Sequence, residues 1–338
     1  MGKIDFVVLW LDSTDPAWIE SYNSYRPDKP IQDKARFRNW DLFRYWFRSV
    51  ERYAPWVNKV FLITNGKYPD WINRDCEKLV LVKHSDYIPV KYLPTFSSNT
   101  IELNIGRIES LSEHFVFFND DMFINAPVTP EYFFKEGLPC DYNFESVFRN
   151  PHYNSKIKFG VDLMMYSDIA VLNNHFDRRE VVKKAWKKWY GPHLWGKALL
   201  FSLLMFNRHK FESFVLFHHA QPMLKSVFHE IWEKEEYLMN DSCSRFRKEL
   251  SLNQYIVRYW QFASNRFYPM KKSGLLYSYY NKDILTDLEK VILEERTVNL
   301  CINDTPDCSD EDFELAAESV RSAFAKKFPI PSTYEKPI

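Results

Sequence analysis

The chain has 338 residues, enough for one large domain or one domain with a sizeable insertion. Lys and Arg together number 45, as do Asp and Glu, so no global charge recruits nucleic acid and any basic surface must be local. The five cysteines are scattered without metal-ligand spacing, and are expected to be reduced thiols of a cytoplasmic protein. No stretch approaches the length of an apolar span, no signal peptide is recognised and no Gly-rich phosphate loop appears. These features predict a soluble or at most peripheral protein without a dinucleotide or P-loop ATP site.

Strands and helices alternate through about the first 125 residues. Strands are predicted at 4–11, 59–64 and 79–83, and a helix at 39–54 carries apolar residues at helical spacing and ends at Pro55. This alternation predicts an α/β fold with a βαβ sheet rather than a sandwich.

A fourth strand is predicted to begin at His114, and it ends at a group of candidate ligand residues. Residues 115–118 are all apolar, as in a strand covered on both faces, and Asn119, Asp120 and Asp121 follow them. Ligands of open α/β sheets bind beyond the carboxyl ends of the strands. Two adjacent carboxylates repel each other, and Mg²⁺ or Mn²⁺ relieves that repulsion while bridging to substrate phosphates. The alternative is a turn made by Asn and Asp.

Two other polar segments are candidates for the same site. Asp12 follows the first strand, while Asp15 and Pro16 suit the start of the next helix. Asp12 is therefore a candidate ligand for a ribose or a metal, or else a turn residue. Ser97 and Ser98 precede a predicted helix that continues to residue 107, where they suit either an anion or an ordinary N-cap.

Residues 160–270 are expected to form a mostly helical segment over the active edge of the sheet, on the acceptor side of the site. Within it, His218 and His219 lie at the start of a predicted helix at 222–232. Arg245 and Arg247 form a small basic cluster, followed by Asn253. The other helices are predicted at 161–176, 179–190, 197–207 and 252–263.

A last strand is predicted at 297–302, after a helix at 283–294. It ends in Asn303 and Asp304, a second acidic strand end. A capping box opens a helix at 310–327, and an extended tail follows. The expected organisation is a single catalytic domain over 1–305, with a C-terminal helix and tail over 306–338. Its parts are a nucleotide-sugar-binding α/β part (1–150), the helical part (160–270) and a return to the sheet (271–305).

Several segments together resemble the Stealth family of sugar-phosphate transferases, which includes bacterial capsule polymerases and the catalytic subunit of the lysosomal N-acetylglucosamine-1-phosphotransferase. They follow the order of the family's characteristic regions over nearly the whole chain. One departure is Ser13, where relatives commonly have glycine. The matching segments are IDFVVLWLDSTDPAW (4–18), RFRNWDLFRYWFRSVERYAPWVNKVFLITNG (36–66), LPTFSSNTIE (93–102), HFVFFNDDMF (114–123), HHAQPMLKSVFHEIW (218–232), RFR (245–247) and CIND (301–304).

The resemblance implies a GT-A-like nucleotide-sugar transferase fold and a divalent metal, Mg²⁺ or Mn²⁺. It implies that hexose-1-phosphate, such as N-acetylglucosamine-1-phosphate, moves from a UDP-sugar to a sugar hydroxyl with release of UMP. The candidate site residues, some carried over by position from the family and others taken from the segments described above, fall into three groups. They are Asp12, Ser97, Ser98, Asn119 and Asn253 for the donor; Asp120, Asp121, Asn303 and Asp304 for the metal; and His218 or His219, Asp121, Arg245 and Arg247 for catalysis.

Of the two histidines, the spacing to the following Gln-Pro favours His218. A neutral histidine takes the hydroxyl proton, while metal and guanidinium stabilise charge on the phosphoryl oxygens. Two alternatives stay open: a conventional GT-A glycosyltransferase that releases UDP, and an inactive scaffold that only binds a sugar nucleotide. The expected partners are a UDP-sugar and an oligosaccharide or polysaccharide acceptor, without nucleic acid. The expected setting is bacterial capsule or exopolysaccharide synthesis, in the cytoplasm or peripherally at the inner face of the membrane.

Overall fold

The computed structural model describes residues 2–26, 38–146, 160–248, 250–272, 274–278, 280–304 and 308–337. The expected boundaries near residues 150 and 305, and the first two residues of the motif at 36–66, lie outside these ranges. The strands are β1 (Ile4–Leu9), β2 (Val60–Thr64), β3 (Leu79–Lys83), β4 (His114–Phe118), β5 (Met122–Ile124), β6 (Phe134–Lys135), β7 (Leu138–Asp141), β8 (Glu145–Ser146), β9 (Ser213–Phe214), β10 (Gln221–Leu224), β11 (Tyr268–Pro269), β12 (Gly274–Tyr277) and β13 (Asn299–Ile302).

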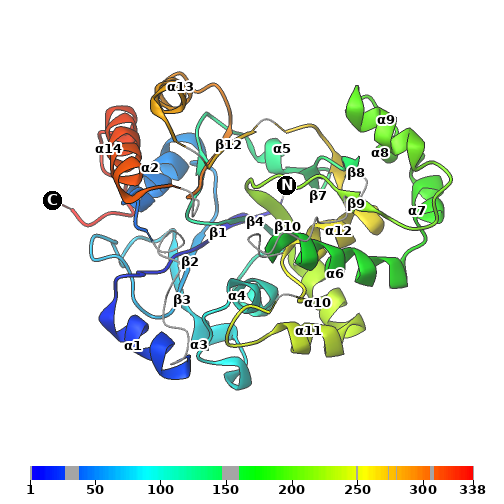
Figure 1. Ribbon diagram of the computed structural model, residues 1–338, viewed down its shortest axis with the longest axis horizontal. Coiled ribbons are helices and arrows are strands. Elements are labelled where there is room, and N and C mark those ends of the chain that lie inside the picture. Colours follow the sequence, from blue (N-terminus) through cyan, green and yellow to red (C-terminus); the bar gives the residue numbers. More distant parts are fainter. Residues whose placement is uncertain are drawn as a thin grey trace.

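Helices surround these strands (Figure 1). The α-helices are α1 (Pro16–Tyr25), α2 (Phe43–Tyr53), α3 (His84–Tyr87), α4 (Ser98–Leu103), α5 (Pro130–Phe133), α6 (Gly160–His175), α7 (Arg178–Lys184), α8 (Trp186–Trp189), α9 (Lys197–Leu204), α10 (Lys225–Lys234), α11 (Glu236–Ser242), α12 (Tyr255–Ala263), α13 (Lys282–Leu293) and α14 (Asp310–Lys327). Two 3₁₀ turns are η2 (Val90–Tyr92) and η3 (Ile105–Arg107).

The main sheet has five strands in the order β10-β4-β1-β2-β3, in which β4, β1, β2 and β3 are parallel. The chain moves from β1 to β2 on one side of β1 and later returns to β4 on the other side. The carboxyl ends of β1 and β4 therefore flank a topological switch point, where α/β proteins bind ligands. The strands are apolar on both faces because helices cover both, and Phe6, Val7 and Val8 are fully buried. The predicted α/β class is confirmed.

One predicted helix was wrong at its start. Residues 221–224 form β10, which pairs antiparallel with β4, and the helix begins only at Lys225. Pro222 suggested a helix start, but it also fits an outermost strand, because no neighbour on the open side needs its missing N–H group. The antiparallel direction places the residues just before β10 at the carboxyl end of β4.

A second sheet of three strands, β12-β13-β5, lies beside the first. The strand β13 pairs antiparallel with β5, which follows directly after the turn at Asp120 and Asp121. The Ile302 backbone N–H donates to the Asp121 carbonyl, with 2.9 Å between N and O. This pairing brings a segment 180 residues further along the chain to the end of β4.

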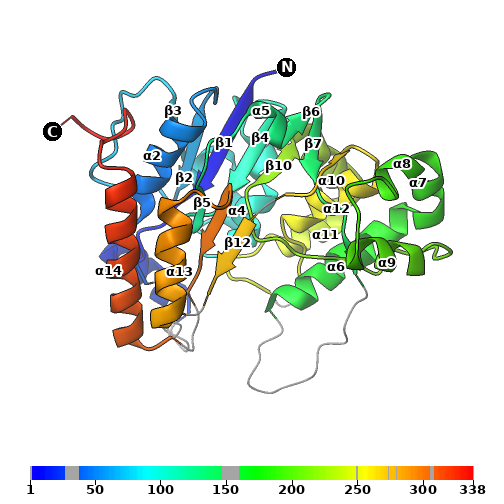
Figure 2. The same ribbon diagram turned by 90° about the horizontal axis from the view of Figure 1, so that it is seen from above.

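Two groups of helices lie on either side of the sheets. Figure 2 shows α2, α13 and α14 on one side and α6 to α12 on the other, as expected for a helical segment after residue 160. The helix predicted at 179–190 is divided at Ala185 into α7 and α8. The helix predicted at 310–327 is confirmed, and the Ser309 hydroxyl accepts from the Asp312 N–H at 3.1 Å. The extended tail packs against the body, where Tyr334 is 2% exposed.

Candidate active site

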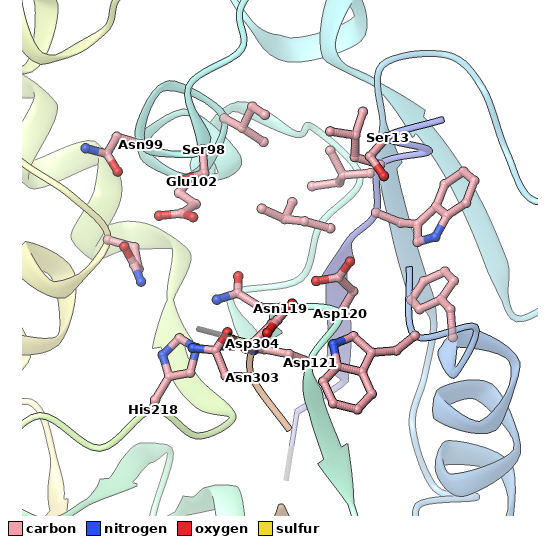
Figure 3. Close-up of a pocket in the computed structure, with 18 of the residues that line it drawn as sticks. Ser13, Ser98, Asn99, Glu102, Asn119, Asp120, Asp121, His218, Asn303 and Asp304 are labelled. Atoms are coloured by element: carbon pink, nitrogen blue, oxygen red, sulfur yellow. Dashed lines mark hydrogen bonds and ion pairs between the residues drawn. The ribbon is translucent and has the colours of Figure 1, made fainter. Parts of the chain in front are cut away.

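A cavity of about 850 Å³ opens at the carboxyl ends of the parallel strands. The residues that end or follow β1, β2, β3 and β4 line it, together with residues of α4, α6 and α12 and the end of β13. The first group is Leu9, Ile63, His84 and Asn119. This cavity lies at the strand ends where the sequence predicted the site. Figure 3 shows polar residues that line the cavity.

Asp120 and Asp121 lie in this cavity with Asn119, directly after β4 (Figure 3). The Asp120 carboxylate faces the open space, but the cavity walls surround it. Loss of solvation, followed by repulsion from Asp121, raises the pKa of Asp120 to about 7. Two neighbouring carboxylates that repel each other are stabilised by a cation between or beside them.

His218 is brought to Asp121 by the pairing of β10 with β4. Its Nε2 lies 3.3 Å from Asp121 Oδ2, and its Nδ1 lies 3.3 Å from the Tyr255 hydroxyl. Burial alone lowers the pKa of His218, but the hydrogen bond and charge of Asp121 outweigh that effect, so the pKa is raised. The carboxylate favours the tautomer with the proton on Nε2, which leaves the Nδ1 lone pair to accept a proton.

Asn303 and Asp304 also line the cavity, as the sequence predicted from their place after a strand. The structure adds Arg38, whose guanidinium lies 3.3 Å from Asp304 and 2.7 Å from Asp310. Arg38 lines the cavity too. It was not among the predicted site residues, although it stands in the quoted motif at 36–66, because nothing in the local sequence connects it with residues some 270 positions later.

The donor atoms suit a hard divalent cation. Asp121 Oδ1 is buried and has no hydrogen-bond partner among the described residues. The Cys301 thiol donates to Asp121 Oδ2 at 3.3 Å, and Asp121, His218 and Cys301 place possible ligand atoms within 4.8 Å of one another. Burial and the Asp121 charge raise the pKa of Cys301 well above its ordinary value, so without a metal the thiol is protonated. Apart from the His218 ring nitrogen, the other polar atoms of Asp120, Asp121, Asn303 and Asp304 that line the cavity include carboxylate and amide oxygens, which Mg²⁺ and Mn²⁺ prefer.

His219 points away from this cavity. It lines a smaller one with Gln221, Arg258 and Lys272, and its ring packs against Gly274, where a Cβ atom would come within 2.1 Å of it. Burial, followed by the charge of Lys272, lowers the pKa of His219 to about 4. The structure therefore separates the two histidines that the sequence left as alternatives.

The Asp12 carboxylate is hydrogen-bonded and ion-paired to nearby residues. Its Oδ1 accepts from the Thr14 N–H at 3.0 Å and from the Thr14 hydroxyl, and its Oδ2 lies 2.9 Å from Lys67 Nζ. These contacts are those of a turn residue, the alternative that the sequence left open for Asp12. It is the next residue, Ser13, that lines the cavity.

Of the two predicted serines and the two predicted arginines, one of each lines the cavity. Ser98 and Arg247 line the cavity and are hydrogen-bonded to each other. Ser97 is buried behind them, without side-chain contact to the cavity. Arg245 does not line the cavity; it donates to the Pro94 carbonyl, and its guanidinium lies 3.9 Å from the centre of the Tyr25 ring. One arginine of the basic cluster faces the site and the other holds loops together.

The wall opposite Asp120 comes from α4 and the segment before α12. Asn253 lines the cavity, and its backbone N–H donates to Asp168 on α6. Asn99 and Glu102 stand on α4, across the cavity from Asp120 and His218 (Figure 3). Glu102 was missed because a single acid in a helix gives no signal until its direction is known. The motif at 93–102 contains it.

Aromatic side chains form much of the remaining wall. Trp10 follows β1, Trp40 and Phe43 precede or begin α2, and Trp10 stacks on Phe43 with ring centroids 5.9 Å apart. Flat aromatic faces of this kind suit a nucleobase or a sugar ring. Within the described ranges, the structure contains no helix that is both long enough and apolar enough to cross a bilayer.

Comparison with known proteins relates this arrangement to one family. Residues 36–140 match the family model described as Stealth protein CR2, conserved region 2. The capsular polysaccharide phosphotransferase WcwK of Streptococcus pneumoniae is 38% identical over 342 residues, covering 99% of this chain and 100% of WcwK. The receptor polysaccharide phosphotransferase WefC of Streptococcus oralis is 38% identical over 326 residues, covering 92% and 93% of the two chains.

Among solved structures, the galactosyltransferase LgtC in complex with donor and acceptor sugar analogues aligns over 95% of both chains. Its identity is 9% and its TM-score is 0.40. The matches to WcwK and WefC run nearly end to end and confirm the resemblance found in the sequence. The chain belongs to the Stealth family of polysaccharide phosphotransferases.

Proposed function

We propose that the chain transfers a hexose-1-phosphate, such as N-acetylglucosamine-1-phosphate, from a UDP-sugar to a sugar hydroxyl. The observation that carries the proposal is the His218–Asp121 pair in a cavity that also holds Asp120, Asn303 and Asp304. The acceptor is an oligosaccharide or polysaccharide, and the setting is capsule or exopolysaccharide synthesis in the bacterial cytoplasm. The names of WcwK and WefC support this class of reaction.

In the proposed reaction, the acceptor oxygen attacks the phosphorus that carries the sugar. A new P–O bond forms, the bond to the uridylyl phosphate breaks, and UMP leaves with the bridging oxygen. The hydroxyl proton passes to His218 Nδ1, while Asp121 holds Nε2–H and stabilises the imidazolium that results. The Tyr255 hydroxyl lies 3.3 Å from Nδ1, and the acceptor hydroxyl would have to approach the same nitrogen.

Mg²⁺ or Mn²⁺, held by Asp120, Asp121, Asn303 and Asp304, would neutralise charge on the pyrophosphate oxygens. Arg247, at the rim beside Ser98, is placed to contact the same phosphates. The aromatic wall formed by Trp10, Trp40 and Phe43 is proposed to hold the uracil or the hexose.

The nucleotide that is released tests the proposal. The protein is incubated with UDP-N-acetylglucosamine or other UDP-hexoses, Mg²⁺ or Mn²⁺, and an oligosaccharide acceptor, and the products are resolved by chromatography and phosphorus NMR. UMP together with a phosphodiester signal is expected. UDP as the product would replace the proposal with a conventional glycosyltransferase. Binding of a UDP-sugar without release, across a panel of acceptors, would indicate the inactive scaffold.

Removal of the metal is the second part of this experiment. Because the cavity gathers carboxylate and amide oxygens, we expect EDTA to abolish UMP release and Mg²⁺ or Mn²⁺ to restore it. Asp120→Asn and Asp121→Asn should each lower the apparent affinity for the metal and the turnover. Full activity in EDTA after exhaustive dialysis would exclude an essential cation.

A further inference from the structure

A group of exposed apolar side chains covers α8, α9 and the turns beside them. We call it the α8–α9 patch, and its members are Trp186 (58% exposed), Trp195 (65%), Leu200 (57%), Leu203 (53%), Leu204 (61%) and Phe206 (59%). Both ribbon views place α8 and α9 at one extremity of the molecule, away from α13 and α14 (Figures 1 and 2). A cluster of this kind on a surface marks an interaction site, whereas single exposed apolar residues do not.

The helix α9 is apolar nearly all round. Its sequence is KALLFSLL, in which only Ala198 and Ser202 are buried. Leu200, Leu203 and Leu204 are spaced three and four residues apart, so they share the outer face. A helix of such composition is ordinarily buried, and here its outer face has no cover among the described residues.

The segment that carries the patch is basic. Residues 181–211 include seven Lys or Arg residues and no Asp or Glu, in a chain whose formal net charge is zero. The positions are Lys183, Lys184, Lys187, Lys188, Lys197, Arg208 and Lys210. Lys188 donates to the carbonyls of Asn265 and Phe267, so it is part of the protein body. All the others are exposed.

Exposed apolar side chains among lysines suit an anionic bilayer better than a second copy of this chain. A second copy that used the same face would bring two strongly positive surfaces together, which is unfavourable. An anionic bilayer offers the opposite charge for the lysines and an apolar interior for the leucines. Tryptophans beside lysines are typical of the boundary between lipid headgroups and acyl chains.

The inner side of α9 links the patch to the active site. Ala198 and Leu194 pack with Tyr142 in a small apolar cluster separate from the main core, and Phe217 packs against it. Phe217 directly precedes His218. The patch therefore lies on the same side of the protein as the segment that carries His218, the proposed base.

We propose that the α8–α9 patch seats this protein on an anionic lipid bilayer, with the apolar side chains in the headgroup boundary and the lysines against acidic headgroups. The proposal rests on exposure and charge and does not depend on the reaction proposed above. It concerns attachment to the surface of a bilayer, not a span.

Vesicle binding tests it. The full chain is sedimented with vesicles of phosphatidylcholine alone, or of phosphatidylcholine mixed equally with phosphatidylglycerol, at low and high salt. Binding is expected only to the anionic vesicles, and it should weaken as salt screens the lysines. The triple variant Leu200→Gln/Leu203→Gln/Leu204→Gln should lower the partition by about tenfold or more, because three apolar side chains no longer enter the boundary.

The matched control changes three apolar residues elsewhere that are of similar or greater exposure, Leu250→Gln, Leu315→Gln and Ile330→Gln. This control should bind like the original chain, and circular dichroism should show that both variants are folded. Lys184→Glu/Lys187→Glu should weaken binding through charge alone. Equal binding by the leucine variant and the control would overturn the proposal. So would an oligomer that forms without vesicles and is lost in the leucine variant, since the patch would then be a contact between copies.

Discussion

His218 and His219 are neighbours in sequence, yet their imidazoles enter different cavities. We expect His218→Gln to lower turnover by about 10²–10⁴-fold, the usual contribution of a well-placed general base. His219→Gln, its matched control, should keep most of the activity, because the ring lies behind the site against Gly274. Initial rates of UMP release, with circular dichroism of both variants, measure the difference. Equal losses in the two variants would mean that the pair acts through the local structure and not through His218 itself.

Arg245 and Arg247 offer a second comparison between near neighbours. Arg247 faces the cavity beside Ser98, whereas Arg245 covers Tyr25. Arg247→Ala should raise the KM for the UDP-sugar or lower kcat, with a combined loss in kcat/KM of about tenfold or more, since a charged hydrogen bond to phosphate is removed. Arg245→Ala should act mainly on thermal stability. Steady-state kinetics and melting curves of the two variants would show the reverse pattern if the assignment of Arg247 to the phosphates were wrong.

On α6, one buried carboxylate connects the helix to the wall of the cavity. Asp168 Oδ1 accepts from the Asn253 N–H at 3.2 Å, and Oδ2 has no partner among the described residues. Burial raises the pKa of Asp168 well above its ordinary value of 3.8, although the Asn253 N–H opposes this. As pH rises above about 4, the unfolded chain loses this proton while the folded chain keeps it, so the group destabilises the fold increasingly.

Asp168→Asn should remove that dependence. The variant and the original chain should have similar melting temperatures near about pH 4, and the variant should melt higher at about pH 8 because its amide cannot ionise. Melting curves of the two proteins across this pH range give the comparison. A difference that did not change with pH would show that Asp168 ionises in the folded chain as readily as in the unfolded chain.

Strand β10 shows how one element depends on its partner. Residues 221–224 contain proline and follow two histidines, a pattern that also suits a helix start, which is why the sequence predicted one. These residues form a strand because their backbone pairs with the edge of β4. Its direction, which no local pattern encodes, decides that His218 reaches Asp121.

The chain closes on itself through its C-terminal tail. Arg48 on α2 holds Glu335 with two hydrogen bonds of 2.7 Å, and their side chains are only 11% and 7% exposed. Glu335→Ala should lower the free energy of unfolding by about 3 kcal/mol, because a buried guanidinium loses its partner. The control Lys326→Ala, which breaks an exposed pair with Glu289, should cost under about 1 kcal/mol. Urea unfolding of both variants measures this, and similar values would mean that the tail contributes little to the fold.

The sequence by itself determined the α/β class, the buried strands and the family, because these depend on apolar runs, on turn residues and on motifs that are local. It also placed Asn119, Asp120, Asp121, Asn303 and Asp304 at strand ends, since the end of an apolar run is visible without a structure. Only the tertiary structure decided which histidine and which arginine face the cavity, and added Arg38 and Glu102 to its wall. The direction of a side chain depends on strand pairing and helix packing between segments 100 or more residues apart, and these contacts leave no local signal.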